Sequence, residues 1–539
     1  MKTASNQSDT TDRIAIEQVR RLRFDPATIV LASSLILLLG SGWLKSGAFK
    51  LAVSGVGAVL LVGWLVKIFR ALTLSSLPLV DGTARQLAWI RIIVCLTALI
   101  YTLMDPLPAI SHLPPGMRND DQFFHLLNSI PAYSALVANP YLLGALQWMT
   151  AGLLFLGLSG LLTRATLFLS AIGFFLAQAI LRHYTYYYHS GLALVYLLFL
   201  LPWTPCSAVW SVDRWLNRKK TPPRAGSIRL SVYGCFGLMA AIYLVSALSK
   251  LRDSGLSWLR GENIEHHLLQ DALTPIFFGD KWKPTIWLVQ HHAPEFIFTV
   301  IATYGVLVEL GYWTVLFSRT ARIVMPIAAF CMHLGILVFQ HLLFIDLLVL
   351  QLIFLDVDRI ANFCRFHFRG REEGTTVQMG KQTSAILPSY IFVASIALLL
   401  TGTLLAWAWS EEFYPFSPWR MYADISKKTP VIYPKLAATL ENGSSITIPI
   451  RDCSPAACAN ARYILFKAFY KKGWNEVFDQ FLASYAERRN RSLAFGSPIS
   501  SIEVQLWRWN YVVDPNDPRF GWVTDVYPYD VTSKRSSLR

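Results

Sequence analysis

The sequence predicts an all-α polytopic membrane protein of about 10–11 transmembrane helices with a small C-terminal extracytoplasmic α+β domain. Of its 539 residues 54% are hydrophobic and only 15% are charged, whereas soluble domains carry roughly 25% charged residues. Apolar runs of about 17 to 22 residues, enough to cross a hydrocarbon core of ~30 Å, recur between Ala27 and Trp409. No such run follows, so the last part of the chain is predicted to fold outside the bilayer.

Eleven apolar runs qualify as spans, and the sixth and tenth are short. In chain order they are Ala27–Leu44, Leu51–Val66, Leu87–Met104, Tyr141–Leu161, Ala165–Leu181, Gly191–Pro205, Leu230–Ser249, Glu295–Phe317, Ile323–Phe339, Leu342–Leu355 and Ile386–Trp407.

The positions of the basic residues predict the orientation of these spans. Positively charged loops are retained on the cytoplasmic side of a membrane, and one topology places five basic loops there together with the N-terminal arginines. These loops contain Lys67 with Arg70, Arg164, residues 213–224, Arg319 with Arg322, and residues 359–381. The same topology places residues 105–140, 251–294 and everything after Trp409 outside. We therefore expect a multi-pass protein of the inner membrane with a cytoplasmic N-terminus and an extracytoplasmic tail.

The chain accordingly divides into six parts. They are a cytoplasmic segment (1–26), two additional N-terminal helices (27–80), a transmembrane core (81–360), a basic cytoplasmic loop (361–385), a last helix (386–409) and the extracytoplasmic domain (410–539).

The tail carries both strand and helix patterns. Lys435–Leu440 and Ser445–Ile450 flank the turn signal Glu441-Asn442-Gly443-Ser444, and Ile502–Val513 alternates like a strand. Residues 459–489 have apolar side chains at helical spacing. Cys453 and Cys458 form the only close cysteine pair of the chain, and a disulfide between them is plausible in an oxidising compartment.

Two ionisable residues are predicted to lie at the same depth on the outer side. His189 begins the sixth span, and Lys250 ends the seventh. A lysine at such a position either extends its ammonium group to the lipid headgroups or lies partly desolvated, where its lowered pKa allows it to act as a base. The tyrosines that precede His189, Tyr188 among them, are typical of an interfacial aromatic belt.

Other polar residues in apolar runs need a partner or water. Glu309, Asp346 and His333 are of this kind, and each is either a structural contact or part of a site. The pairs His266-His267 and His291-His292 lack a carboxylate at ligand spacing, so we expect no metal. The basic residues lie in separate loops, which argues against a nucleic-acid partner. Phosphate-binding glycine loops and GxSxG elbows are also absent.

Four blocks of sequence resemble one family in order. They are YYYHSGLALVYLLFLLPW, WSVDRWL, YLVSALSKLRDSGLSWLRGE and FCMHLGILVFQHLLFIDLLVL. In this order they are similar to the HTTM superfamily, which includes the vitamin K-dependent gamma-glutamyl carboxylases, and they cover about half of the chain. The phrase FYPFSPWRMY resembles the segment that follows the last span in bacterial members.

The resemblance implies a site and a reaction. It implies Lys250 as the base that deprotonates a hydroquinone and His189 as its polar partner, with Tyr188, Trp258 and His333 as candidates for contact with the cofactor. The implied cofactors are reduced vitamin K or menaquinol with O2 and CO2, and the implied substrate is an extracytoplasmic protein or peptide. The tail is too short for the propeptide-binding domain of the eukaryotic carboxylases, so membership predicts the fold more strongly than the reaction.

Two other function classes stay open. The protein could be a non-catalytic assembly or maturation factor that holds a secreted client through its tail. Less favoured is a transporter lined by Glu309 and Asp346, because the sequence has no inverted repeat or paired interrupted spans.

Overall fold

The computed structural model describes residues 82–119, 122–184, 189–217, 225–274, 283–360, 387–424, 430–452, 461–471, 473–492 and 495–532, with Pro223 and part of 33–63. The first predicted span, Tyr188 and the pair Cys453–Cys458 lie wholly or mostly outside these residues, whereas residues 52–60 of the second predicted span are helical.

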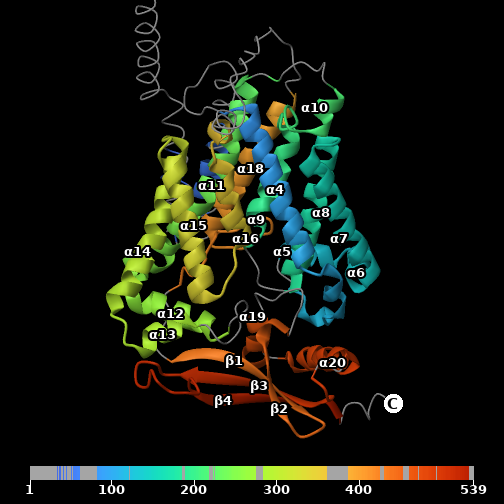
Figure 1. Cartoon of the computed structure of the whole chain (residues 1–539), viewed down its shortest axis with the longest axis vertical. Helices are drawn as coiled ribbons and strands as arrows, with labels where there is room; N and C mark the ends of the chain where they lie inside the picture. Colours follow the sequence, from blue (N-terminus) through green and yellow to red (C-terminus); the bar gives the residue numbers. More distant parts are fainter. Residues whose placement is uncertain are drawn as a thin grey trace, which may run out of the picture.

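Long helices run side by side and form a bundle, and a small sheet covers one end of it (Figure 1). Seven of the described helices are long and apolar enough to cross a membrane. They are α4 (Ala84–Met104), α7 (Pro140–Ser159), α8 (Thr163–Tyr184), α11 (Ala225–Ser254), α14 (Glu295–Gly311), α15 (Ala321–Gln340) and α18 (Leu387–Trp409).

The sixth and tenth predicted spans form shorter apolar helices. They are α9 (Leu192–Leu200), continued by η3 (Leu201–Trp203), and α16 (Ile345–Val349), continued by η6 (Leu350–Phe354). At ~1.5 Å per residue such helices cover roughly half of a ~30 Å core. The described residues thus contain seven apolar helices of membrane-spanning length and two shorter ones, and the two shorter ones are the runs that the sequence marked as short.

Side-chain caps explain where several long helices begin. Asp213 in α10 (Val212–Leu216) accepts hydrogen bonds from the backbone N–H of Leu162 and of Thr163, both at 2.8 Å, and so caps α8. Asn139 caps α7 by accepting from Tyr141 N–H at 2.9 Å. These bonds satisfy N–H groups that have no partner within the helix.

The loops divide between the two ends of the bundle as the basic residues predict. α10 lies at the end opposite the sheet (Figure 1), and the alternating direction of the long helices brings Arg164, Arg319 and Arg322 to the same end. The sheet end holds the short elements η1 (Leu107–His112), η2 (Pro115–Met117), α5 (Gln122–Asn128), α6 (Pro131–Ala138), η4 (Gly255–Leu259), α12 (Gly261–Ala272) and α13 (Pro284–Gln290).

The tail forms the predicted α+β fold. Its antiparallel sheet has the order β2-β1-β3-β4, built from β1 (Val431–Leu440), β2 (Ser445–Ile448), β3 (Ile499–Trp509) and β4 (Trp522–Asp530). The predicted helical stretch is two helices, α19 (Ala461–Tyr470) and α20 (Asn475–Ser492), separated near Gly473, which has a φ of +72°. The sequence reading missed β4, whose side chains are mostly exposed and show no alternation.

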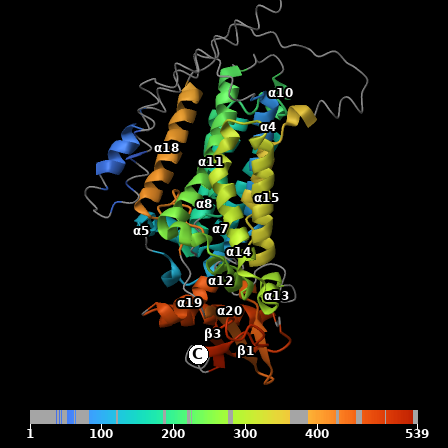
Figure 2. The ribbon, with the colours of Figure 1, turned by 90° about the vertical axis from the view of Figure 1, so that its left-hand side faces the viewer.

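The tail packs directly on the bundle. One core cluster joins Leu107 and Ile110 of η1 to Leu482 of α20, and another joins Leu269 of α12 to Tyr433 of β1. In the side view α11 runs down the middle of the bundle, between α18 and α15 (Figure 2). This central position matters because α11 carries Lys250 at its sheet end.

Apolar side chains are exposed along the outer helices. On α14 and α15 they include Phe296, Val300, Leu307, Ile323, Val324, Ile327 and Phe330. Contiguous apolar surface of this extent is unfavourable in water. The exposed apolar faces are therefore compatible with a multi-pass membrane protein whose outer helices contact lipid.

Candidate functional site

Lys250 lies in the interior and forms an ion pair. Its side chain is on the last turns of α11 and only 4% of the residue is exposed. The Nζ atom is 2.7 Å from each carboxylate oxygen of Glu309 on α14, and it donates to Ser246 Oγ at 3.0 Å. The ammonium group therefore does not reach toward lipid headgroups, the first of the two alternatives left open by the sequence.

The side chain of Trp258 covers this ion pair. Its ring centroid lies 5.3 Å from Lys250 Nζ, a cation–π arrangement. Its Nε1–H donates to the carbonyl of Tyr422 at 2.6 Å, which fixes the ring. Trp258, a candidate from the sequence, is thus in contact with Lys250.

A polar stripe on α11 extends from Lys250 into the bundle. Tyr243, Ser246 and Lys250 are spaced by three and four residues, so they lie on one face of the helix. The Tyr243 hydroxyl is 2.9 Å from His333 Nε2 and accepts from Gln351 Nε2 at 2.8 Å. His333 Nδ1 is buried and has no hydrogen-bond partner among the described residues. The third cofactor candidate therefore lies next to the stripe with one ring nitrogen unused.

His189 contacts the tail segment. Its Nδ1 is 3.1 Å from Ser417 Oγ, and its ring stacks on Trp419 with centroids 5.6 Å apart and planes inclined by 23°. No hydrogen bond joins His189 to Lys250 among the described residues. Lys250 is nevertheless near enough for its charge to act on the rings of both His189 and His333.

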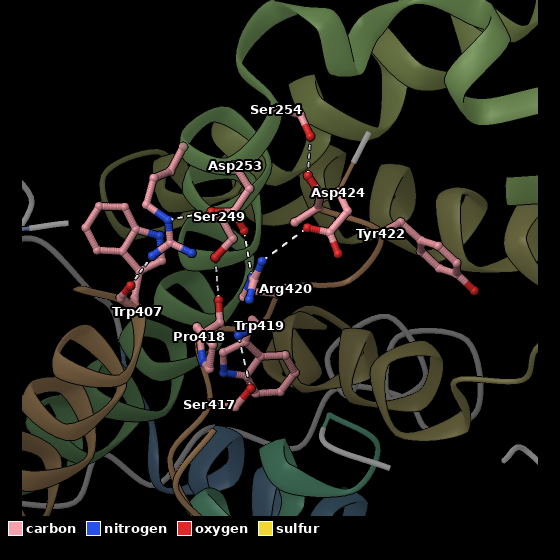
Figure 3. Close-up of polar contacts among 12 residues, drawn as sticks. Ser249, Asp253, Ser254, Trp407, Ser417, Pro418, Trp419, Arg420, Tyr422 and Asp424 are labelled. Atoms are coloured by element: carbon pink, nitrogen blue, oxygen red, sulfur yellow. Dashed lines mark hydrogen bonds and ion pairs between the residues drawn. The ribbon is translucent and has the colours of Figure 1, made fainter. Parts of the chain in front are cut away.

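Residues 417–419 connect the two predicted site residues. Ser249, which precedes Lys250, donates to the carbonyl of Pro418 at 2.5 Å (Figure 3). The flanking Ser417 and Trp419 contact His189. Ser417 and Trp419 are almost completely buried. The segment after the last long helix therefore contacts both His189 and Ser249, the neighbour of Lys250.

Ion pairs hold this segment in place. Asp253 accepts from Arg420 Nε and from Arg252 Nε, each at 2.7 Å (Figure 3). Further along, the Tyr422 hydroxyl donates to Asp271 of α12 at 2.7 Å. The motif FYPFSPWRMY thus docks onto the ends of α11 and α12.

Asp346 holds the turn that carries His189. It is fully buried, and it accepts from Gly191 N–H at 2.8 Å and from the Tyr101 hydroxyl at 3.3 Å. Gly191 has a φ of +76°, a conformation that suits glycine, and a Cβ there would come within 2.8 Å of Gln178 Oε1. Asp346 therefore has a structural partner, which explains its presence in an apolar run.

The sequence reading missed Arg182 and Glu412. Arg182, near the end of α8, donates to the Ser190 carbonyl and to Gln178 Oε1, the latter at 2.9 Å. Its guanidinium carbon is 5.3 Å from the centroid of the Tyr414 ring. The sequence signal for Arg182 was a single charged residue in the run LAQAILRHY. It was passed over because basic residues are common at the ends of membrane spans.

Arg182 and Glu412 line a small pocket. The other lining residues are Phe123, Phe124, Leu192, Tyr414 and Phe416. Burial raises the pKa of Glu412 to about 7, against the opposing effects of a hydrogen bond with Ser417 and of the Arg182 and Arg420 charges. The pocket therefore presents a carboxyl group that titrates near neutral pH.

His267 and His291, one from each histidine pair, contact neighbouring protein groups. His267 Nε2 is 3.3 Å from the Asp424 carbonyl, and His291 stacks on Trp287 at 4.4 Å between ring centroids. Across the residues that the structure describes, no group of three His, Cys, Asp or Glu side chains is arranged to hold a metal ion.

Comparison with known proteins leaves the geometry as the main guide. No protein-family model, no curated protein and no solved structure matches the chain. The site is accordingly defined by its own contacts: a buried Lys250–Glu309 pair flanked by His189 and His333 and bounded by residues 417–419.

Proposed function

We propose that the protein is a membrane enzyme of the carboxylase-like, quinol-linked type, with Lys250 as the base and His189 as its polar partner. The observation that carries this proposal is the buried pairing of Lys250 with Glu309 at 2.7 Å. Within such a pair a proton can pass from the ammonium to the carboxylate, which yields a neutral amine without a separated charge in a medium of low dielectric. The neutral amine is the form of lysine that acts as a base.

The position of Lys250 suits a hydroquinone, which is soluble in lipid. A hydroquinone partitions into the bilayer, and Lys250 lies where a predicted span meets the outer segment. Removal of a hydroquinone proton by the amine restores the ammonium, which pairs with the hydroquinone anion while Glu309 keeps the proton that it accepted. His189 and His333, each close to Lys250, supply imidazole groups that can bind the two oxygens of such a ring.

The resemblance to the HTTM superfamily supports the chemistry that would follow. In that family the oxygenated quinol generates a strong base that removes a proton beside a glutamate carboxyl group, and CO2 then adds. The substrate would be an extracytoplasmic protein or peptide, reached from the side on which the tail lies. Access from that side requires the sheet end of the bundle to lie on the extracytoplasmic side of the inner membrane.

Epoxide formation tests the proposal. The purified protein is supplied with reduced vitamin K or menaquinol and O2, and the expected product is the quinone epoxide. Lys250→Ala should lower the rate by about 10²-fold or more, as loss of a general base does, whereas Lys471→Ala on the tail should leave it unchanged. If the wild-type protein forms no epoxide with any of these quinols and Lys250→Ala behaves normally in cells, an enzymatic function of this type is excluded.

Capture of a secreted client is the second candidate, and the edge of the tail sheet favours it. β4 is an edge strand, and Trp522 and Val526 on it are 52% and 46% exposed. An exposed, apolar edge can add a strand from another chain. If this is the function, Val526→Lys should abolish activity in cells while Lys250→Ala retains it, and the reverse pattern would exclude it.

A further inference from the structure

Tyr422 contacts both the cover of Lys250 and the end of α12. Its carbonyl accepts the Nε1–H of Trp258 at 2.6 Å, and its hydroxyl donates to the Asp271 carboxylate at 2.7 Å. The ring points away from Trp419, which belongs to the same segment (Figure 3). One residue therefore joins the indole that covers Lys250 to a carboxylate on a different helix.

A buried ion pair continues this connection into the tail. Asp271 lies on the last turn of α12 and is 2% exposed, and its carboxylate pairs with Arg462 Nη1. Arg462 belongs to α19 of the tail, and its side chain is only 12% exposed. A buried carboxylate needs a compensating charge, so Asp271 ties α19 to the bundle.

The backbone of the connecting segment is strained at two residues. The φ angle is +52° at Tyr422 and +50° at Trp419, in the left-handed region that bulky residues rarely adopt. Such a conformation persists only when the surrounding contacts over-determine it. At Tyr422 these contacts are its two side-chain and carbonyl hydrogen bonds and the edge-on packing of its ring on His267, with centroids 5.2 Å apart. Loss of one contact lets the backbone relax, which moves the carbonyl that holds Trp258.

Trp258 depends on this carbonyl for its orientation. An indole ring has a single hydrogen-bond donor, so the carbonyl of Tyr422 is the one polar contact that can fix the rotation of the ring. Trp258 itself lies on η4, directly after α11, whereas Tyr422 comes from the segment after α18. The position of the ring over Lys250 therefore depends on a part of the chain that the tail holds.

We propose that Tyr422, Asp271 and Arg462 are positioning residues through which the docked tail holds Trp258 over Lys250. This inference rests on the proposed function, in which Lys250 is the base. Trp258 is 4% exposed and its ring centroid lies 5.3 Å from Lys250 Nζ, so the ring shields the ion pair from water. Separation of α19 from α12 frees the ring, and the site is complete only while the tail is docked.

Hydrogen exchange at the Trp258 indole tests this connection. The full chain is labelled with ¹⁵N-tryptophan in lipid nanodiscs, and the Trp258 signal is identified by its loss in Trp258→Phe. The wild-type N–H should exchange slowly with deuterium oxide. Tyr422→Phe, which keeps the ring and removes the hydroxyl, and Arg462→Gln should each speed this exchange about 10-fold or more, as loss of a hydrogen bond or ion pair with a charged group does.

Two matched variants separate this effect from a general loosening of the tail. Arg491→Gln breaks an exposed ion pair on α20 and should leave the Trp258 exchange at the wild-type rate. Arg462→Lys keeps the positive charge and should recover most of the protection that Arg462→Gln loses. Wild-type exchange in Tyr422→Phe and Arg462→Gln, or an equal effect of Arg491→Gln, would overturn the inference. Tyr422→Phe alone decides the matter if Arg462→Gln does not fold.

Quinol turnover supplies the functional measurement. Tyr422→Phe and Arg462→Gln should lower kcat by about 10-fold or more, because a side chain displaced by about 1 Å at a reacting group has an effect of this order. If the Trp258 exchange responds to both variants but the wild-type protein consumes no quinol, the connection stands and the enzyme assignment falls. If the wild type and both variants consume quinol at the same rate, the enzyme assignment stands and the positioning role falls.

Discussion

Single residues in this protein are constrained most strongly where a charge is buried. Lys250 is 4% exposed and Glu309 7% exposed, and the two form a single charge-neutral unit. Burial of the two charges costs solvation free energy, and their close contact in a low-dielectric interior offsets that cost. The burial of each residue therefore depends on the presence of the other. Removal of one leaves an uncompensated charge.

A double-mutant cycle measures this dependence. Lys250→Met should lower the free energy of unfolding by about 3–5 kcal/mol, and the double variant Lys250→Met/Glu309→Gln should recover a large part of that loss. Unfolding is followed in mixed micelles by circular dichroism. Single-variant losses below about 1 kcal/mol that simply add would contradict a buried pair.

Glu265 on α12 is a second sensitive residue, outside the spans. Burial raises its pKa to about 7, and the charges of Glu295 and Glu262 add to the effect. The folded state therefore holds this proton up to a higher pH than the unfolded state, whose glutamate has a pKa of ~4.3. Stability is greatest below that value and falls as the pH rises to about 7.

Glu265→Gln should remove this pH dependence. The variant is expected to melt at a higher temperature than the wild type at pH 8, and the difference should vanish near pH 4.5. Thermal denaturation at both values checks the sign. Glu503→Gln, an exposed residue on β3, serves as the control and should follow the wild type, while a variant that is less stable at pH 8 would contradict the argument.

Individual helices are held by caps and by close approach. α8 depends on Asp213, which lies about 50 residues away in sequence on α10. α11 and α18 approach each other at Gly234, where an added Cβ would contact Ile396 Cδ1 and lie 2.7 Å from Phe392 Cζ. Small residues at helix interfaces allow this kind of approach in membrane proteins.

Two glycines on α11 give a matched test of that approach. Gly234→Ala should destabilise the protein by about 1–3 kcal/mol through overpacking against α18. Gly237→Ala, one turn further, should be neutral or stabilising by up to about 1 kcal/mol, because nothing lies within 4 Å of its added Cβ. Equal effects of the two variants on melting temperature would show that the helices do not pack as described.

At the scale of the whole molecule, the two ends of the helix bundle carry different elements. The tail sheet and the short elements η1, α5, α6 and α12 lie at one end of the bundle, and α10 lies at the other (Figure 1). Among the described residues, Arg164, Arg214, Arg319 and Arg322 lie near the α10 end, which predicts that this end is cytoplasmic.

Reporter fusions test this orientation. Alkaline phosphatase, which folds only outside the cytoplasm, should be active when fused after residue 532 and inactive when fused after Asp358. The amounts of both fusion proteins are compared by immunoblot. Activity in the second fusion and none in the first would reverse the topology, and with it the side from which a substrate reaches Lys250.

Much of this architecture follows from local pattern. Apolar runs of membrane-spanning length predicted the long helices because burial of such a run in lipid requires an α-helix that satisfies its own backbone. Length also identified α9 and α16 as short. The β1–β2 turn and the helical part of the tail followed from turn residues and periodicity, whereas the exposed strand β4 had no apolar pattern to reveal it.

The site required the tertiary structure. The sequence singled out Lys250, His189, Glu309 and Asp346 as costly polar residues in apolar runs. Only the fold paired Lys250 with Glu309, assigned Asp346 to the turn at Gly191, and brought Ser417 and Trp419 from the tail segment to His189. The hydropathy pattern of a sequence shows which polar residues must avoid contact with lipid. Their partners lie tens to hundreds of residues away in the sequence, so the packing of whole helices decides which residues meet.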